Sequence, residues 1–433
     1  MRDWPIAQLA DVADIRVSGV DKLSSINEKP VRLCNYMDVY ANDYVRADLP
    51  FMKATATAAE IARFKVAQGD VMITKDSETP EDIGIPAVVI DEIEGLVCAY
   101  HLALLKPNRS LIDPIYLSKQ LATPATARYF ARNAAGSTRY GLSNGAIART
   151  PLPMAPLNQQ RKIAAILTNI DTAIGKTEAL IAKYQQIKAG LMHDLFTRGV
   201  LPNGQLRPPR ERAPELYQET MTGWIPKEWV AKTLATACDW FSGGTPSKRN
   251  ENWWRGSLPW LSPKDMKRFE LADTEDHVTR QAALSGSRIA PEGSIFIVVR
   301  GMILAHSFPV VIGGAEFAFN QDVKAVIGRA PLINRYLAYW FVANTDLFLK
   351  KTTESTHGTK RFDLSDLYKI EIGVPSDPEQ RRAIDRLDVV EVRISSEMAQ
   401  RDKLQTQKLG LMQDLLTGKV AVKLYATAPE TMA

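Results

Sequence analysis

The chain repeats itself, and this repeat limits its possible folds more than any other feature. The segment from Gln160 to Val200 aligns without a gap with the segment from Gln380 to Val420, in a chain of 433 residues. About a third of the aligned positions are identical, including the pattern G-L-M-x-D-L-x-T that begins at Gly190 and again at Gly410. Weaker likeness precedes each copy. A long internal repeat predicts one architecture built twice.

Both repeated segments have the apolar spacing of long amphipathic helices. Apolar positions recur alternately four and three residues apart, which is typical of a helix that packs along another helix. A helix from about residue 160 to 196 would measure on the order of 55 Å. We expect the two helices to pair antiparallel and to end near Gly199 and Gly418. The alternative, two core helices that each pack in their own domain, fits less well because the spacing persists so long.

The predicted helix-pairing and subunit-contact positions share this seam. In the first copy they are Ile163, Leu167, Ile170, Ile174, Ile181, Tyr184, Leu191 and Leu195, and in the second copy Leu387, Val390, Ile394, Leu404, Leu411 and Leu415.

The segments that precede the helices are predicted to be mixed α/β domains. Strand-like runs cover residues 71–73, 87–90 and 102–105 in the first half, and 294–299 and 310–312 in the second. Helices are expected at 114–120 and 331–343. The predicted fold class is α/β (α+β), with two such domains joined by two long helices. The predicted boundaries are 1–157 for the first domain, 158–199 for its helix, 200–222 for a proline-rich linker, 223–377 for the second domain, 378–420 for its helix and 421–433 for a tail.

The composition is that of an ordinary globular protein. Lys and Arg number 54 against 49 Asp and Glu, and the net charge of +5 permits nucleic-acid binding without proposing it. Cys34, Cys98 and Cys238 lie far apart, so neither a zinc site nor a disulfide framework is expected. No run of about 18 apolar residues occurs, and we expect a cytoplasmic protein without a membrane span.

The sequence lacks the motifs of the enzyme classes considered. It has no complete phosphate-binding P-loop, no adenine-methyltransferase motif and no G-x-S-x-G nucleophile elbow. Its five histidines have no metal-ligand spacing. Asp38 and Asp265 recur in both halves, but a structural cap explains them more simply than catalysis. A non-enzymatic binding protein, with no catalytic residue and no metal, is therefore predicted.

The order of these segments resembles the specificity subunit of type I restriction-modification systems. The resemblance covers nearly the whole chain, and its specific parts are Gln159–Ile163, Gly190–Thr197, Leu201–Pro214 and Thr222–Trp229. The second copy has the usual E-Q-R pattern at Glu379, whereas Gln159 replaces the acid in the first copy.

This resemblance implies a function in DNA recognition. It implies two target-recognition domains that read the two halves of a bipartite, asymmetric target in double-stranded DNA, with the helices as the spacer. It also implies that the chain binds two adenine methyltransferase (modification) subunits and, through them, restriction (translocase-nuclease) subunits. S-adenosylmethionine, ATP and magnesium would belong to those partners. The alternatives are the recognition subunit of a related type II system, a fused enzyme, and a coiled-coil scaffold without a DNA role.

Candidate DNA contacts lie in loops that combine basic, hydroxyl and amide groups. These loops follow strand-like runs or precede a Leu-Ser pair. The segment 355–361 supplies one of them. The Trp253, Trp254 and Trp260 rings are expected to pack in a core instead. The predicted DNA-binding residues are Thr74, Lys75, Ser77, Arg139, Tyr140, Ser262, Lys264, Arg300, Thr359, Lys360 and Arg361.

Overall fold

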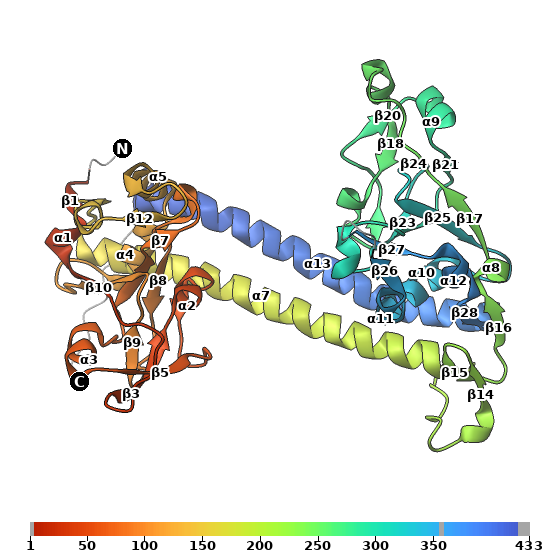
Figure 1. The fold of residues 1–433 in the computed structure, drawn as a ribbon, viewed down its shortest axis with the longest axis horizontal. Helices are drawn as coiled ribbons and strands as arrows, with labels where there is room; N and C mark the ends of the chain where they lie inside the picture. Colours follow the sequence, from red (N-terminus) through yellow and green to blue (C-terminus); the bar gives the residue numbers. More distant parts are fainter. Residues whose placement is uncertain (1–3, 355–358, 423–433) are drawn as a thin grey trace, which may run out of the picture. The chain divides into compact units, whose positions relative to one another are not determined.

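The computed structural model describes residues 4–354 and 359–422. The chain divides into two compact units: unit 1 comprises residues 1–178 and 399–433, and unit 2 comprises residues 179–398. Two long helices, α7 (Leu157–Thr197) and α13 (Asp377–Leu416), each contribute one part to each unit (Figure 1). The predicted long helices are therefore confirmed, with ends within four residues of the expected ones.

Unit 1 is built on a five-stranded sheet and a smaller three-stranded sheet. The larger sheet is antiparallel except for its last pair, which is parallel. Its strand order is β2 (Ala13–Val17), β10 (Leu102–Pro107), β6 (Val71–Thr74), β8 (Pro86–Val89) and β4 (Tyr44–Val45). The smaller sheet has the order β5 (Met52–Ala56), β3 (Lys29–Cys34) and β9 (Leu96–Cys98).

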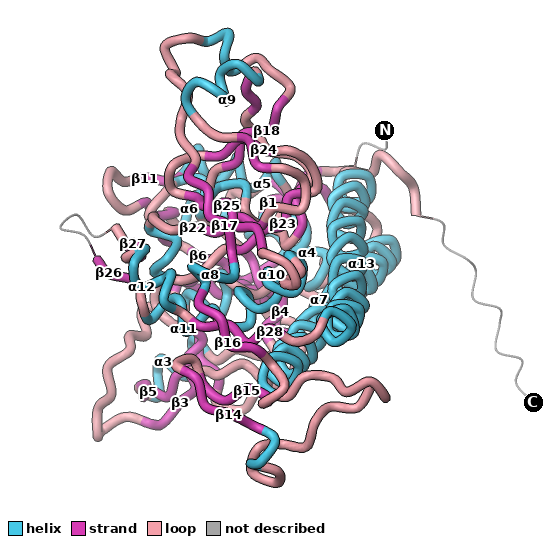
Figure 2. The backbone as a smooth tube through the Cα atoms, turned by 90° about the vertical axis from the view of Figure 1, so that its right-hand side faces the viewer, coloured by secondary structure: helices cyan, strands magenta, loops and turns pink. Residues whose placement is uncertain are grey.

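Unit 2 repeats this topology strand for strand in its larger sheet. The order is β17 (Cys238–Ser242), β25 (Val323–Gly328), β22 (Ile295–Val298), β23 (Val310–Gly313) and β19 (Glu270–Leu271), again with a parallel last pair. The smaller sheet has the order β20 (His277–Val278), β18 (Leu258–Leu261), β24 (Phe317–Phe319) and β21 (Ile289–Ala290). Helix α9 (Arg280–Gly286) lies beyond this sheet (Figure 2). The duplication thus extends to the diverged segments.

Short strands and helices complete each unit. In unit 1 these are β1 (Ile6–Gln8), α1 (Leu9–Val12), α2 (Tyr36–Tyr40), α3 (Ala58–Phe64), β7 (Asp76–Ser77), α4 (Pro114–Leu121), α5 (Pro124–Asn133), β11 (Ala134–Ala135), β12 (Tyr140–Leu142), α6 (Asn144–Ala148) and β13 (Pro151–Pro153). In unit 2 they are β14 (Tyr217–Thr220), β15 (Gly223–Pro226), β16 (Val230–Thr233), α8 (Leu234–Ala237), α10 (Asn334–Ala343), α11 (Thr345–Lys350), β26 (Thr352–Glu354), β27 (Lys360–Phe362), α12 (Leu364–Lys369) and β28 (Glu371–Val374).

The long helices pack against each other within each unit. In unit 1, Ile163 and Leu167 of α7 share a core with Leu415 of α13. In unit 2, Leu195 of α7 shares a core with Leu387 of α13. The beginning of one helix thus meets the end of the other, which makes them antiparallel in each unit. Every predicted seam position is buried or partly buried.

A buried glutamine joins the first turn of each long helix to loops that precede the helix in the sequence. The Gln160 side chain accepts a hydrogen bond from the N–H of Asp113 and donates to the carbonyl oxygens of Leu111 and Ala155. Gln380 accepts from the N–H of Ile333 and donates to the carbonyls at positions 331 and 375. Each partner in the second set lies 220 residues after its counterpart. The glutamine that recurs in both copies of the repeat is thus explained by its hydrogen bonds.

Both long helices end close to the glycines at which the sequence predicted their ends. Gly199 has a φ of +67° and Gly418 a φ of +71°, a conformation that side chains with a Cβ disfavour. A Cβ at Gly199 would also lie 2.2 Å from Oε1 of Glu379. Only glycine fits there.

The segment predicted as a proline-rich linker, 200–222, is docked against the start of α13. Arg207 is buried and binds Glu379 in the first turn of α13, with Nη1–Oε1 at 2.5 Å. The predicted boundary after Thr222 falls in the turn of the β14–β15 hairpin. Glu228 also pairs with Arg207, and Arg382 donates to the carbonyl of Val200. These contacts join distant parts of the chain, so composition alone does not indicate them. Most of the predicted tail, residues 423–433, lies outside the described residues.

Several smaller expectations are also resolved. Trp260 is buried in a core with Trp253 and Trp254 packed against it, as expected. The three cysteines are buried and unpaired. Asp38 and Asp265 cap short helical turns, accepting the N–H groups of Asn35 and Ser262. In the described residues, no helix is long and apolar enough to cross a membrane, and no cluster of His, Cys, Asp and Glu suits a metal ion.

Candidate nucleic-acid interface

In each unit, several polar segments converge where two central strands of the five-stranded sheet end, β6 and β10 in unit 1 and β22 and β25 in unit 2. We call this the recognition edge. It gathers the residues after β6 or β22, those before β10 or β25, and a short neighbouring strand. In unit 1 it comprises residues 75–77, 100–101 and 140–141, and in unit 2 residues 299–300, 321–322 and 360–361. Segments far apart in the sequence thus form one surface in each unit.

In unit 1, backbone hydrogen bonds hold the recognition edge together. The N–H of Lys75 donates to the carbonyl of His101, and the carbonyl of Lys75 accepts from the N–H of Leu142. The His101 ring nitrogen Nδ1 lies 2.6 Å from Oδ2 of Asp76. The Lys75 ammonium is 3.8 Å from the same carboxylate, and its side chain is partly exposed. This edge offers one acid, one base and one imidazole.

In unit 2, the equivalent segments carry more positive charge. The N–H of Gly301 donates to the carbonyl of Lys360, and Arg300 faces Arg361 across a backbone bridge. The Arg300 Nε donates to Oδ1 of Asp322 at 2.7 Å. A hydrogen bond from Lys360 to Glu354 lowers the pKa of that carboxyl below its usual range. The structure therefore brings together three predicted basic residues from two distant segments.

The same register position carries opposite charge in the two units. Leu102 pairs with Thr74 in unit 1, and Val323 pairs with Val298 in unit 2, so Asp76 corresponds to Arg300. Likewise, His101 corresponds to Asp322. An acid bound to a histidine in unit 1 is thus replaced by an arginine bound to an acid in unit 2.

Three predicted contact residues have little or no surface. Thr74 is fully buried, and its hydroxyl oxygen accepts the N–H of Ile85. Ser77 and Ser262 are also buried, and their hydroxyls bind Thr79 and Asp265 respectively. Thr74 therefore presents no surface to DNA in this structure, because its hydroxyl satisfies a local backbone group instead. The two serines are likewise used by their own turns.

The remaining predicted residues are at the surface. Arg139 is exposed, and Tyr140 is partly buried beside the core. Lys264 is exposed, and its hydrogen bonds to Asp276 and Glu275 raise its pKa. Thr359 is partly exposed. The rest of that loop, Ser355 to Gly358, lies outside the described residues.

Sequence reasoning did not nominate several polar residues at the recognition edges. Thr245 donates to the amide oxygen of Gln321 in unit 2. In unit 1, the Tyr100 ring lies beside His101, with the Lys22 ammonium 5.8 Å from its centroid. Pairing of β10 with β6 and of β25 with β22 places these residues on this surface.

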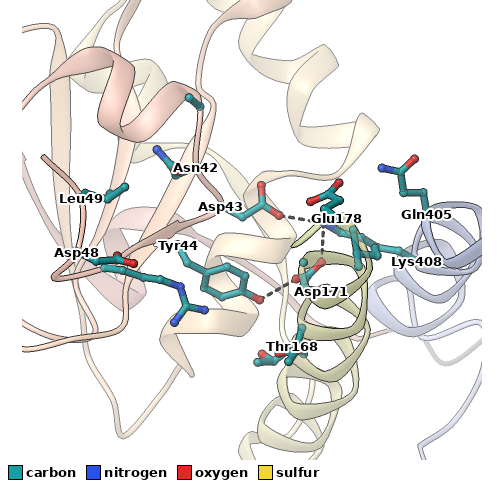
Figure 3. Close-up of a pocket in the computed structure, with 15 residues that line it drawn as sticks. Asn42, Asp43, Tyr44, Asp48, Leu49, Thr168, Asp171, Glu178, Gln405 and Lys408 are labelled. Atoms are coloured by element: carbon teal, nitrogen blue, oxygen red, sulfur yellow. Dashed lines mark hydrogen bonds and ion pairs between the residues drawn. The ribbon is translucent and has the colours of Figure 1, made fainter. Parts of the chain in front are cut away.

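A second charged site joins the recognition domain of unit 1 to the long helices. Asp43 and Asp171 both bind Lys119 and Lys408, with separations of 2.7 to 2.9 Å. The hydroxyl of Tyr44 donates to Asp171 (Figure 3). Burial by itself would raise the pKa of Asp43, but the two lysine charges outweigh it and lower the pKa to about 2. These residues line an open cleft beside α7 and α13.

Unit 2 has an equivalent charged site with different side chains. Lys188 binds Glu391 at 2.5 Å, which repeats the Lys408–Asp171 pair after exchange of the two helices. Arg335 binds Asp388 and Glu270, and the Tyr339 hydroxyl also donates to Asp388. Each recognition domain is thus oriented on the helices by buried or half-buried charges.

A family model matches most of the chain. The Type I restriction modification DNA specificity domain matches residues 1–186 and 226–406, so that both units contain a match. The chain belongs to this family.

Curated members of the type I DNA specificity family are similar to this chain. The EcoR124I/EcoR124II specificity subunit of Escherichia coli is 33% identical over 181 residues, which cover 41% of this chain and 45% of that relative. The putative MjaX specificity subunit of Methanocaldococcus jannaschii is 21% identical over 430 residues, which cover 97% of this chain and 94% of the relative. The first relative therefore matches over less than half its length.

Solved structures share the fold of this family member. The S subunit of a type I restriction-modification system from M. genitalium gives a TM-score of 0.58 at 12% identity, covering 95% of this chain and 96% of that one. A chain from a structural study of type I complex assembly gives 0.52 at 15% identity, covering 97% and 99%. At these identities the likeness concerns the fold alone.

Proposed function

We propose that this chain selects the DNA sequence on which a type I restriction-modification complex acts. Each unit reads one half of a bipartite target through its recognition edge. Because the two edges differ in chemistry, the target is asymmetric. Lysine and arginine side chains neutralise phosphates, and other groups at the edges contact bases.

One observation supports this function above the others. The two units keep the same backbone arrangement at the recognition edge, but the hydrogen-bonded pair is Asp76–His101 in unit 1 and Arg300–Asp322 in unit 2, so that an acid at one register position is replaced by an arginine. A scaffold that acts only through its helices would not require different side chains at this position. Two domains that recognise different half-sites would require them.

We further propose that the long helices bind two adenine methyltransferase subunits and, through them, restriction subunits. Large apolar side chains remain exposed on these helices, at odds with a helix that faces only water. In unit 2 these are Leu180, Ile187, Val389 and Val392. The chain itself carries out no catalysis in this proposal, and S-adenosylmethionine, ATP and magnesium act on the partner subunits.

Methylation sequencing tests this function directly. The chain is expressed with its methyltransferase partner in a host that lacks adenine methylation, and methylated adenines are mapped across the genome. We expect one bipartite, asymmetric motif that disappears when the chain is omitted. A single continuous palindrome, or methylation that does not depend on the chain, would contradict the proposal.

The basic residues at the edge of unit 2 can be tested through salt dependence. Replacing both Lys360 and Arg361 with Ala removes two charges, so the affinity of the complex for DNA should fall and the slope of log Kd against log salt should decrease by about two. The control replaces Arg329 and Lys369 with Ala. Both are exposed cations of unit 2 that pair with Asp239 and Asp366 respectively. Equal slopes for the two variants would remove Lys360 and Arg361 from the interface.

A further inference from the structure

The guanidinium group of Arg300 is bound to Asp322 through Nε, and its terminal nitrogens Nη1 and Nη2 remain available for hydrogen bonds to a ligand. Its Nε donates to Oδ1 of Asp322, while the side chain remains 54% exposed. Within the described residues, no acceptor contacts Nη1 or Nη2 of Arg300. The two terminal nitrogens therefore form a planar pair of donors that has no acceptor among the described residues.

The backbone on both sides of this pair is fixed. The carbonyl of Asp322 accepts the N–H of Val299 at 2.8 Å, and Arg300 forms a bridge with Arg361. The N–H of Asp322 in turn donates to the Asn320 side chain at 3.1 Å. Arg300 therefore lies two residues after β22 and Asp322 directly before β25, and backbone hydrogen bonds hold both positions. A donor pair that is already oriented loses little entropy when it binds.

A planar pair of donors has a specific partner in duplex DNA. Guanine presents two acceptors, O6 and N7, in the major groove, and arginine binds both at once. At the corresponding position of unit 1, Asp76 offers only acceptors while it is ionised. A carboxylate is repelled by the guanine edge and accepts instead from the amino group of cytosine.

We propose that Arg300, positioned by Asp322, reads a guanine in the half-site recognised by unit 2, and that Asp76 excludes guanine from the corresponding position in unit 1. This inference deepens the proposed function and depends on it. It assigns base specificity to the position occupied by Asp76 in unit 1 and by Arg300 in unit 2.

The test uses the complex of the full chain with its methyltransferase partner. Arg300→Gln removes the charged fork and should relax the methylated motif at a single base, a guanine, in one half-site only. Asp322→Asn keeps the arginine but removes its carboxylate partner, and should relax the same base more weakly. Arg329→Gln is the control, since Arg329 binds Asp239 by the same Nε–Oδ1 contact at the other end of the β17–β25 pair. It should leave the motif unchanged.

A binding measurement decides the result even if a variant loses methylation. The probe is a duplex with the mapped motif in which the guanine is replaced by 7-deazaguanine or adenine. The wild-type complex should prefer guanine over adenine by roughly 5- to 150-fold, and Arg300→Gln should remove most of this preference. An undiminished preference, or relaxation at a base other than guanine, would overturn the inference while leaving the proposed function intact. Loss of the bipartite motif in the wild type would instead refute the proposed function.

Discussion

At the scale of single residues, buried polar side chains explain much of what the two copies of the repeat have in common. Gln160 and Gln380 are almost inaccessible to solvent, and each forms three hydrogen bonds with the loops beside its helix. Their partners are backbone groups, which cannot be replaced by substitution. A buried donor or acceptor left without a partner is costly.

We therefore expect Gln380→Ala to destabilise the chain strongly. The substitution leaves one backbone N–H and two carbonyls without their partner, and it creates a cavity. The free energy of unfolding should fall by about 2–4 kcal/mol. Urea denaturation measures this change. Gln186→Ala, at an exposed position of α7, is the control and should stay within about 0.5 kcal/mol of the wild type.

The neighbouring position shows how the two copies have diverged. Glu379 accepts hydrogen bonds from Arg207 and from the N–H of Val200, whereas the first copy has Gln159 there. Without the Glu379 carboxylate, the buried Arg207 would keep only its ion pair with the exposed Glu228, so part of its charge would be uncompensated. Glu379 is thus the residue that fixes the segment after α7.

Glu379→Gln should cost on the order of 3 kcal/mol of stability and release this segment. Limited proteolysis is expected to cut between residues 200 and 216 in the variant before it cuts the wild type. Asp377→Asn, which disrupts an exposed ion pair with Arg381 in the same turn, should cost about 1 kcal/mol or less. Similar proteolysis of both variants would show that the buried pair does not hold the segment.

At the scale of elements, charged groups rather than apolar contacts alone orient the recognition domain of unit 1 on its helices. Lys119 of α4 is 3% exposed and Asp171 of α7 is 9% exposed, so this contact is shielded from solvent. Asp43 adds a second carboxylate, which binds both Lys119 and Lys408. Ion pairs need a defined geometry, so they specify how a domain sits on a helix.

Acid should weaken this contact. The pKa of Asp43 is about 2 in the folded chain, below the usual value of 3.8. Its ion pairs therefore stabilise the fold above about pH 4, and this contribution is lost as the pH falls towards about 2. In urea denaturation, the stability difference between the wild type and Asp43→Asn should shrink from about pH 7 to about pH 3. Because Asp43 is half exposed, the difference at neutral pH should stay below about 1 kcal/mol.

Asp48→Asn provides the control for this pH dependence. Asp48 lines the same cleft but forms no ion pair with the described residues. Its variant should follow the wild type at every pH. A stability difference for Asp43→Asn that stays constant down to about pH 3 would show that the ion pairs do not govern acid sensitivity.

At the scale of the whole molecule, duplication predicts that the two units act on separate parts of the target. Changes at the recognition edge of unit 1, such as Lys75→Ala with His101→Ala, should alter only one half of the methylated motif. Changes at Arg300 should alter only the other half. Methylation sequencing of the two variants measures this separation. Coupled changes in both halves would contradict independent reading.

Much of this architecture could be predicted because it depends on periodic patterns. The spacing of apolar residues in the repeat predicted α7 and α13, and the runs at 71–73 and 294–299 predicted central strands. Burial of apolar groups enforces such patterns wherever they occur along the chain. The candidate interface was predicted less well. Thr74 and Arg300 both follow or end strand-like runs, and local sequence does not distinguish the buried hydroxyl from the exposed guanidinium.

The amino-acid sequence by itself determined the duplication, the two long helices and the α/β class, because helical and strand periodicity and the glycine stops are local properties. Only the tertiary structure decided which polar side chains share a surface. Strand pairing brings Arg300 to Asp322 and Asp76 to His101, and a buried ion pair turns the segment after α7 into part of unit 2. The partners in these contacts are separated by between 22 and 172 positions in the sequence. Such contacts stabilise the chain only after folding has brought the partners together.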